Sequence, residues 1–140
     1  MEIKEDKSFS EAWKRIPREL IPLADKIRSL IFSSARELEL DYLSLTTKWG
    51  EASFVSSKGV TIRLAAYKHQ QGALGVFFPC SSTMIQNCKE LFPEEFEYEK
   101  QRAIILSKEG KLNTLTLELV IRAALNYHRV KQEPNLGMAV

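Results

Sequence analysis

The feature that most constrains the fold is a change in the spacing of apolar residues along the chain. Between residues 114 and 128 they recur every three or four positions, which is the spacing of one face of an α-helix. Residues 42–80 are instead rich in β-branched and aromatic types and carry isolated glycines, as strands and turns do. A chain of 140 residues has room for one such mixed core and is too short for two. The sequence therefore predicts a single α+β domain.

The two kinds of spacing predict the element order α-α-β-β-β-α-β-β-α. Helices are expected at residues 8–16, 22–38, 82–92 and 114–128. Strands are expected at residues 54–55, 60–67, 73–78, 96–99 and 102–106. Because short turns join consecutive strands, we expect a largely antiparallel sheet of about five strands with helices packed on one face. The domain is expected to span residues 8–129, between a flexible N-terminus at 1–7 and a flexible C-terminal tail at 130–140.

Charge and hydropathy argue against several classes of function. Twenty Lys and Arg face eighteen Asp and Glu, and the resulting net charge of +2 is too small to indicate nucleic acid or an anionic membrane. No run approaches the roughly 20 apolar residues that span a bilayer, and the first residues lack the apolar core of a secretion signal. We therefore expect a cytoplasmic monomer or small homo-oligomer whose partner is a small molecule or a protein.

Sequence motifs of several common activities are missing. The six glycines are scattered and form no phosphate-cradling loop. No Cys-x-x-Cys or His-x-x-x-His spacing indicates a zinc or iron–sulfur site. Of the two cysteines, Cys88 falls on the apolar stripe of a predicted helix and is expected to be a buried thiol.

Two arginines in predicted strands are the best candidates for a binding site. Arg63 and Arg102 each lie among apolar or small residues, where a guanidinium is unfavourable unless it is paired. A structural ion pair with Glu51 or Glu97 would satisfy them, and so would the carboxylate or phosphate of a ligand. Trp49, in the segment Trp49-Gly50-Glu51, is either part of the core or an aromatic platform at the mouth of a pocket.

A second candidate group precedes the third predicted helix. Ser81, Ser82 and Thr83 would cap this helix or, with its free N–H groups, bind an anion. Cys80 would lie beside the same helix N-terminus, where the pKa of a thiol tends to fall. It could then be a ligating thiol or a nucleophile, with an arginine stabilising developing negative charge. The sequence offers no general base for such an enzyme.

Acidic residues form a third candidate group. Surfaces rich in carboxylates can bind hard cations weakly. Alternation along the strand predicted at 96–99 also sends its glutamates towards solvent, as on an ordinary surface. The acidic clusters consist of Glu94, Glu95, Glu97 and Glu99, and of Glu37, Glu39 and Asp41.

Six short segments occur in a recognisable order between about residues 20 and 128. They are Trp49 to Phe54, Thr61 to Arg63, Cys80 to Thr83, Glu90 to Pro93, Arg102 to Ile104 and Asn126 to His128. Together they resemble the YdhG-like domain of unknown function. That family usually has proline where this chain has Ala52, and tends to have Gly-Asn at Lys100-Gln101. The resemblance implies a small α+β fold and, through relatives described as frataxin-like iron chaperones, a role in iron binding.

Three functions follow as hypotheses. The favoured one is a non-enzymatic domain that binds a small, anionic ligand or a protein segment, with no cofactor. The alternatives are a frataxin-like iron-binding protein that uses the glutamates at 94–99 with Asp41, and an enzyme that uses Cys80. The residues expected to form the ligand site are Trp49, Glu51, Arg63, Cys80, Thr83 and Arg102.

Overall fold

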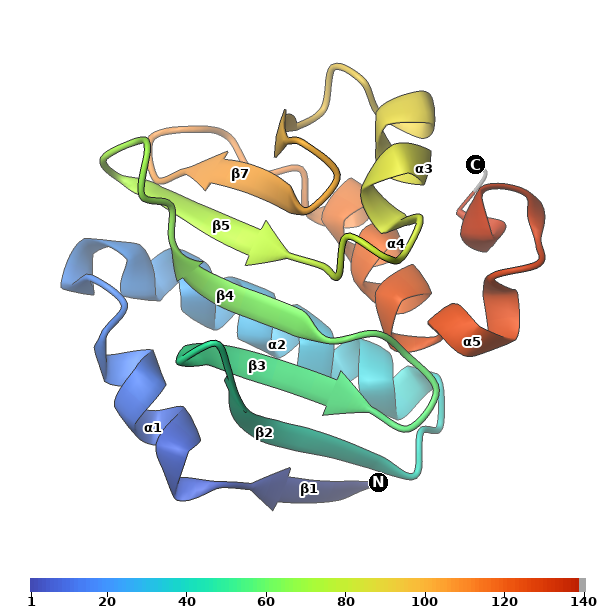
Figure 1. Cartoon of the computed structure of the whole chain (residues 1–140), viewed down its shortest axis with the longest axis horizontal. Coiled ribbons are helices and arrows are strands. Elements are labelled where there is room, and N and C mark those ends of the chain that lie inside the picture. The colour runs from blue at the N-terminus through green and yellow to red at the C-terminus, as the bar shows by residue number, and fades with distance from the viewer. Residues whose placement is uncertain (139–140) are drawn as a thin grey trace.

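The computed structural model describes residues 1–138 and has an α+β fold built on a seven-stranded sheet (Figure 1). The strands are β1 (Glu2–Glu5), β2 (Tyr42–Lys48), β3 (Glu51–Ser56), β4 (Ile62–Ala66), β5 (Ala73–Phe77), β6 (Glu97–Glu99) and β7 (Ala103–Ser107). The α-helices are α1 (Lys7–Lys14), α2 (Ile21–Glu37), α3 (Met84–Leu91), α4 (Thr114–Leu125) and α5 (Tyr127–Val130). Two short 3₁₀ helices, η1 (Arg18–Leu20) and η2 (Pro134–Gly137), complete the described elements.

The strands lie in the order β1-β2-β3-β4-β5-β7-β6. Strands β2 to β5 form an antiparallel meander in which each strand pairs with the next along the chain. After α3 the chain forms the hairpin β6–β7, and β7 pairs with β5, so that β6 becomes one edge of the sheet. Strand β1 forms the other edge and pairs with β2 in parallel. The sheet is therefore mixed.

The prediction of about five strands in a largely antiparallel sheet, and the predicted element order, are wrong because β1 and β2 were not anticipated. Strand β1 lies within residues 1–7, where a flexible terminus was expected, and its alternating charges give no apolar pattern. Strand β2 buries Leu43 and Leu45, but leucine is a common helix residue and these two follow Leu38 and Leu40, which come directly after α2. The period of two was therefore hidden by the helical pattern before it.

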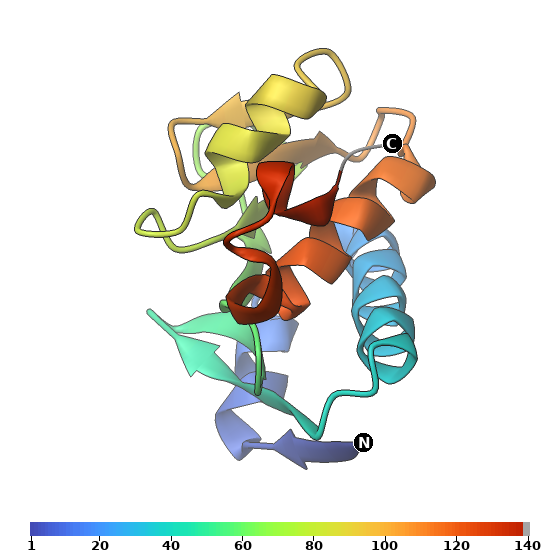
Figure 2. The ribbon, with the colours of Figure 1, turned by 90° about the vertical axis from the view of Figure 1, so that its right-hand side faces the viewer.

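The helices α1, α2 and α4 lie on one face of the sheet (Figure 2). On this face Phe54 of β3 meets the ring of Phe9 edge to face, with 5.4 Å between ring centroids. Helix α2 contacts α4 and contributes Ile27 and Ile31 to the same core, and both side chains are fully buried. Because these helices all lie on one side, alternation along β3, β4, β5 and β7 directs every second side chain to a face that they leave uncovered.

The C-terminal residues contribute to the core beside α3. Within the tail expected to be flexible, η2 contacts α3, and both Leu136 and Met138 are buried. Residues 139 and 140, which belong to the same predicted tail, lie outside the described residues.

The connection between β3 and β4 is attached to the end of α4. Three hydrogen bonds hold it: Ser56 Oγ donates to the Leu125 carbonyl (2.9 Å), Val60 N–H to the Ala124 carbonyl (2.9 Å) and His128 N–H to the Lys58 carbonyl (2.8 Å). Gly59 lies between them, where a Cβ atom would be 2.3 Å from the Ala124 carbonyl oxygen. Only glycine allows this approach of two backbones.

We expect Gly59→Ala to lower the free energy of unfolding by about 1–3 kcal/mol, because the added methyl group must push the β3–β4 connection away from α4. Urea denaturation would measure the change. Gly110→Ala is the matched control, because a Cβ atom there would make ordinary contacts at 3.4 Å or more. If the two variants were equally stable, the close approach of the backbones at Gly59 would not require glycine.

Candidate functional site

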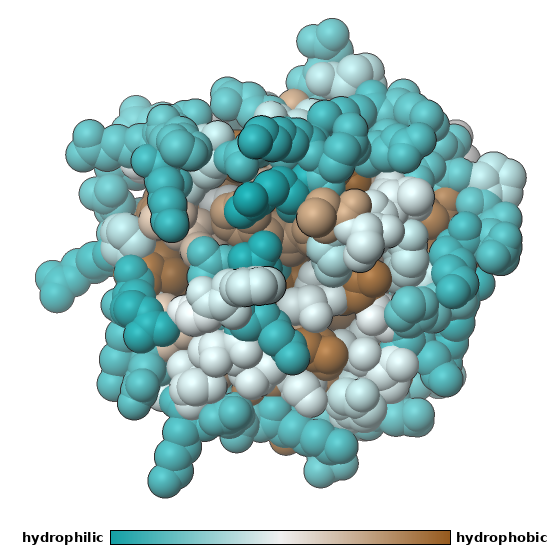
Figure 3. All heavy atoms as spheres, in the orientation of Figure 1, coloured by the Kyte–Doolittle hydropathy of each residue, from teal (hydrophilic) through white to brown (hydrophobic). Residues whose placement is uncertain are grey.

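The uncovered face of the sheet carries a row of neighbouring side chains from five strands. Register places Ser53 of β3 opposite Arg63 of β4, Arg63 opposite Phe77 of β5, and Phe77 opposite Ala103 of β7. Ala103 in turn lies opposite Glu99 of β6. In Figure 3, which views this face, hydrophilic side chains lie among pale and hydrophobic ones. The row therefore sets charged groups beside apolar surface.

Two arginines meet at the ring of Phe77. The Cζ atom of Arg63 lies 5.0 Å from the ring centroid, and that of Arg102 lies 5.4 Å from it. Both distances are within the range of cation–π attraction. The ring lies close over Gly75, where a Cβ atom would be 2.4 Å from it. The absence of a side chain at Gly75 thus lets the ring lie against the sheet, within reach of both guanidinium groups.

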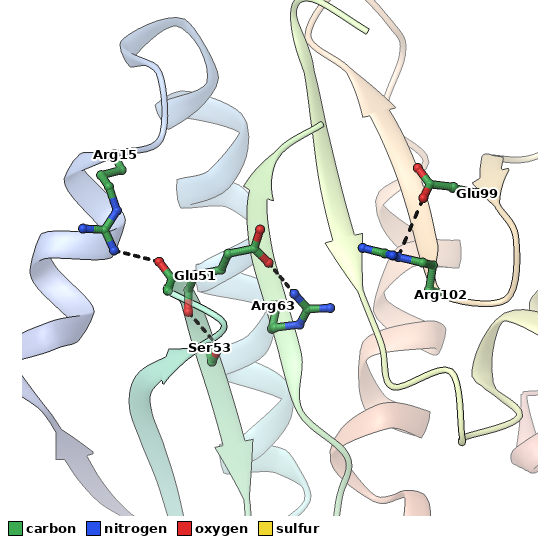
Figure 4. Close-up of polar contacts among 7 residues, drawn as sticks. Arg15, Glu51, Ser53, Arg63, Glu99 and Arg102 are labelled. Atoms are coloured by element: carbon green, nitrogen blue, oxygen red, sulfur yellow. Dashed lines mark hydrogen bonds and ion pairs between the residues drawn. The ribbon is translucent and has the colours of Figure 1, made fainter. Parts of the chain in front are cut away.

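Each arginine also has a carboxylate partner (Figure 4). Arg63 forms an ion pair with Glu51, one of the two partners suggested by the sequence, and its side chain is only 16% exposed. The side chain of Arg102 is 47% exposed, and its Nε atom lies 3.7 Å from Glu99 Oε1. A guanidinium has five N–H donors, so one carboxylate leaves several of them available to a ligand. Arg63 is thus held firmly, whereas Arg102 is more open to solvent.

A hollow of about 640 Å³ opens beside these arginines, within the size range of small-molecule sites. It is lined by five of the six residues expected to form the ligand site: Trp49, Glu51, Arg63, Cys80 and Arg102. Lys48 and Lys68 also line this hollow and were missed. Lys48 ends β2 and Lys68 lies in the loop between β4 and β5, and only the pairing of the strands brings these segments together. The one feature of the sequence that could have indicated Lys48 as a site residue is its position next to Trp49.

The sixth expected residue, Thr83, is not among the residues that line either this hollow or its neighbour. Its backbone N–H donates to the Tyr127 hydroxyl (3.1 Å), and its own hydroxyl lies 3.3 Å from the same atom. The N-terminus of α3 is therefore contacted by Tyr127. Ser82, which was expected to cap α3, accepts a long bond from Met84 N–H (3.4 Å).

The turn between β2 and β3 presents Trp49 at the hollow. Trp49 and Gly50 are its two central residues and both have positive φ, +57° and +75°, as a type I′ turn requires. Arg15, which directly follows α1, donates a hydrogen bond to the Gly50 carbonyl (2.7 Å) and holds the turn in place. The indole is 90% exposed, so the interpretation of Trp49 as a core residue is wrong. A left-handed backbone is unfavourable for a bulky residue, and such strain often marks functional sites.

A second hollow of about 240 Å³ adjoins the first and shares Glu51, Lys68 and Arg102 with it. Tyr67 and Glu99 line it. Glu99 raises the pKa of the Tyr67 phenol, chiefly as a hydrogen-bond acceptor that favours the protonated form, with burial and charge repulsion adding to the effect. Glu99 Oε2 is buried without a hydrogen-bond partner among the described residues.

The acidic residues of the iron-binding hypothesis do not form a metal-binding group among the described residues. Glu95 is hydrogen-bonded to Asn113, and Glu94 and Glu97 are exposed. Within residues 1–138, no three His, Cys, Asp or Glu side chains gather closely enough to hold a metal ion. Cys88 is buried as expected, and burial raises the pKa of its thiol to about 12.

Comparisons with known proteins found no match for this chain among family models, curated proteins or solved structures. The resemblance to the YdhG-like family therefore stays a prediction. In the described part of the chain, no helix has the length and apolar character needed to cross a membrane. Interpretation of the site rests on its geometry and charge.

We expect one thiol to react in the native protein. Cys80 is exposed, whereas Cys88 is buried and has a pKa of about 12, so its reactive thiolate is scarce at pH 8. A chromogenic disulfide reagent should label one thiol per chain in buffer and two in urea. The variant Cys80→Ser should give no native labelling. Rapid labelling of two thiols in the native wild-type protein would contradict this.

We also expect Trp49→Asn to raise the free energy of unfolding by about 1 kcal/mol, because asparagine accepts the left-handed backbone of a type I′ turn. Urea denaturation would measure the gain. Trp49→Ala is the control, because it removes the indole but keeps a residue that disfavours positive φ. If the asparagine variant were no more stable than the alanine variant, the turn would not be strained by Trp49.

Proposed function

We propose that this chain is a non-enzymatic domain that binds a small anionic ligand in the hollow on the uncovered face of its sheet. The observation that carries the proposal is the meeting of Arg63 and Arg102 at the ring of Phe77. These arginines come from different hairpins, and both line the larger hollow. Had they faced opposite sides of the sheet, a common anion site would have been untenable.

The charge balance of the two hollows supports an anionic ligand. Four cationic side chains face two carboxylates, which leaves an excess of two positive charges before any charge on His69. A concave surface with one excess sign of charge attracts ligands of the opposite sign. The cationic residues are Lys48, Arg63, Lys68 and Arg102, and the carboxylates are Glu51 and Glu99.

The two arginines differ in how firmly their side chains are held. Arg63 is held in advance by Glu51 on one side and by the Phe77 ring, so little side-chain freedom is lost when a ligand binds. Arg102 keeps a looser contact with Glu99 and can turn its fork towards a carboxylate or phosphate. Binding would therefore use one fixed and one adjustable guanidinium.

A thermal-shift titration with inorganic phosphate and citrate tests the proposal. A ligand at 100 times its dissociation constant adds about 2.7 kcal/mol to the unfolding free energy, or several degrees in a domain of this size. We expect a saturable shift in the wild-type protein that Arg102→Gln reduces. The same anions should slow the labelling of Cys80, which lines the hollow.

The control for this experiment is Arg18→Gln, because Arg18 is exposed and lies outside both hollows. It is needed because phosphate and citrate can stabilise any folded protein by exclusion from its surface. Arg18→Gln should keep the full wild-type shift. Equal shifts in wild type and Arg102→Gln, with unchanged Cys80 labelling, would contradict an anion site at the hollow.

A further inference from the structure

Trp49 is unusually exposed, although the turn that carries it is firmly held. It is the most exposed large hydrophobic side chain of the described residues, at 90%. Its backbone is fixed by the pairing of Lys48 with Glu51 and by the hydrogen bond from Arg15 to Gly50. The turn thus presents the indole at the hollow with most of its surface free. A flat ring of a ligand can stack on such an aromatic surface.

The excess charge indicates how much negative charge the ligand carries. An excess of two positive charges is neutralised by one dianionic group or by two separate carboxylates. A phosphate monoester carries about −1.5 to −2 charges at pH 7, and its oxygens match the fork of an arginine. Lys68 lines both hollows and adds a third positive charge to the site of such a phosphate.

We infer that the ligand is a flat ring joined to a phosphate monoester, as in a nucleoside monophosphate. The ring would stack on Trp49, and the phosphate would bind Arg63 and Arg102, which line the same hollow. This inference rests on the proposed anion site and specifies its ligand.

Four probes separate the parts of this ligand: inorganic phosphate, ribose 5-phosphate, adenosine and adenosine 5′-monophosphate. Isothermal titration would give their dissociation constants. We expect the monophosphate to bind about ten- to a hundredfold more tightly than ribose 5-phosphate, which lacks the ring. Trp49→Asn should remove that preference while leaving the affinity for ribose 5-phosphate unchanged.

Leu115→Asn is the matched control for Trp49→Asn, because Leu115 is also an exposed apolar residue and lies outside both hollows. It should keep the preference for the ring. Equal wild-type affinities for ribose 5-phosphate and the monophosphate would overturn the inference but leave the anion site standing. If none of the phosphates bound in an Arg102-dependent manner, both the inference and the proposed function would fall.

Discussion

The packing of α1, α2 and α4 on a single face of the sheet is the constraint from which the candidate site follows. Once Leu64 and Val76 are buried beneath these helices, alternation directs their neighbours Arg63 and Phe77 to the opposite face. A slip of one residue in this pairing would bury the arginine and expose the core. The same apolar contacts that stabilise the domain therefore also fix the position of the charged groups.

Two unfavourable features lie at the hollows. Trp49 combines a left-handed backbone with an exposed indole, and a buried oxygen of Glu99 has no hydrogen-bond partner among residues 1–138. The opposite face of the sheet holds a continuous apolar core. A well-packed face that supports strained residues is typical of a binding surface carried on a stable scaffold.

The sequence was most informative where a local pattern decides the structure. The spacing in α4 and the alternation in β4 were sufficient to predict these elements, and Arg63 and Arg102 were recognised because guanidinium groups need partners in strands. The features that the sequence did not reveal depend on contacts between distant segments of the chain. The meeting of both arginines at Phe77 requires the register of three strands, and the closeness of Lys68 to Trp49 requires the whole meander. Local capping preference likewise could not reveal that Tyr127 occupies the place beside Thr83.

The parallel edge strand β1 has a consequence for motion. All four of its residues are exposed, and its sheet pairing is to β2 alone, about forty positions further along the chain. Such a strand can detach without disturbing the meander, so its amide hydrogens would exchange with solvent long before those of β4 or β5. Detachment would leave β2 as a free edge that accepts any strand of suitable sequence. A second copy of the chain could supply its own β1, giving an exchange of N-terminal strands between two molecules.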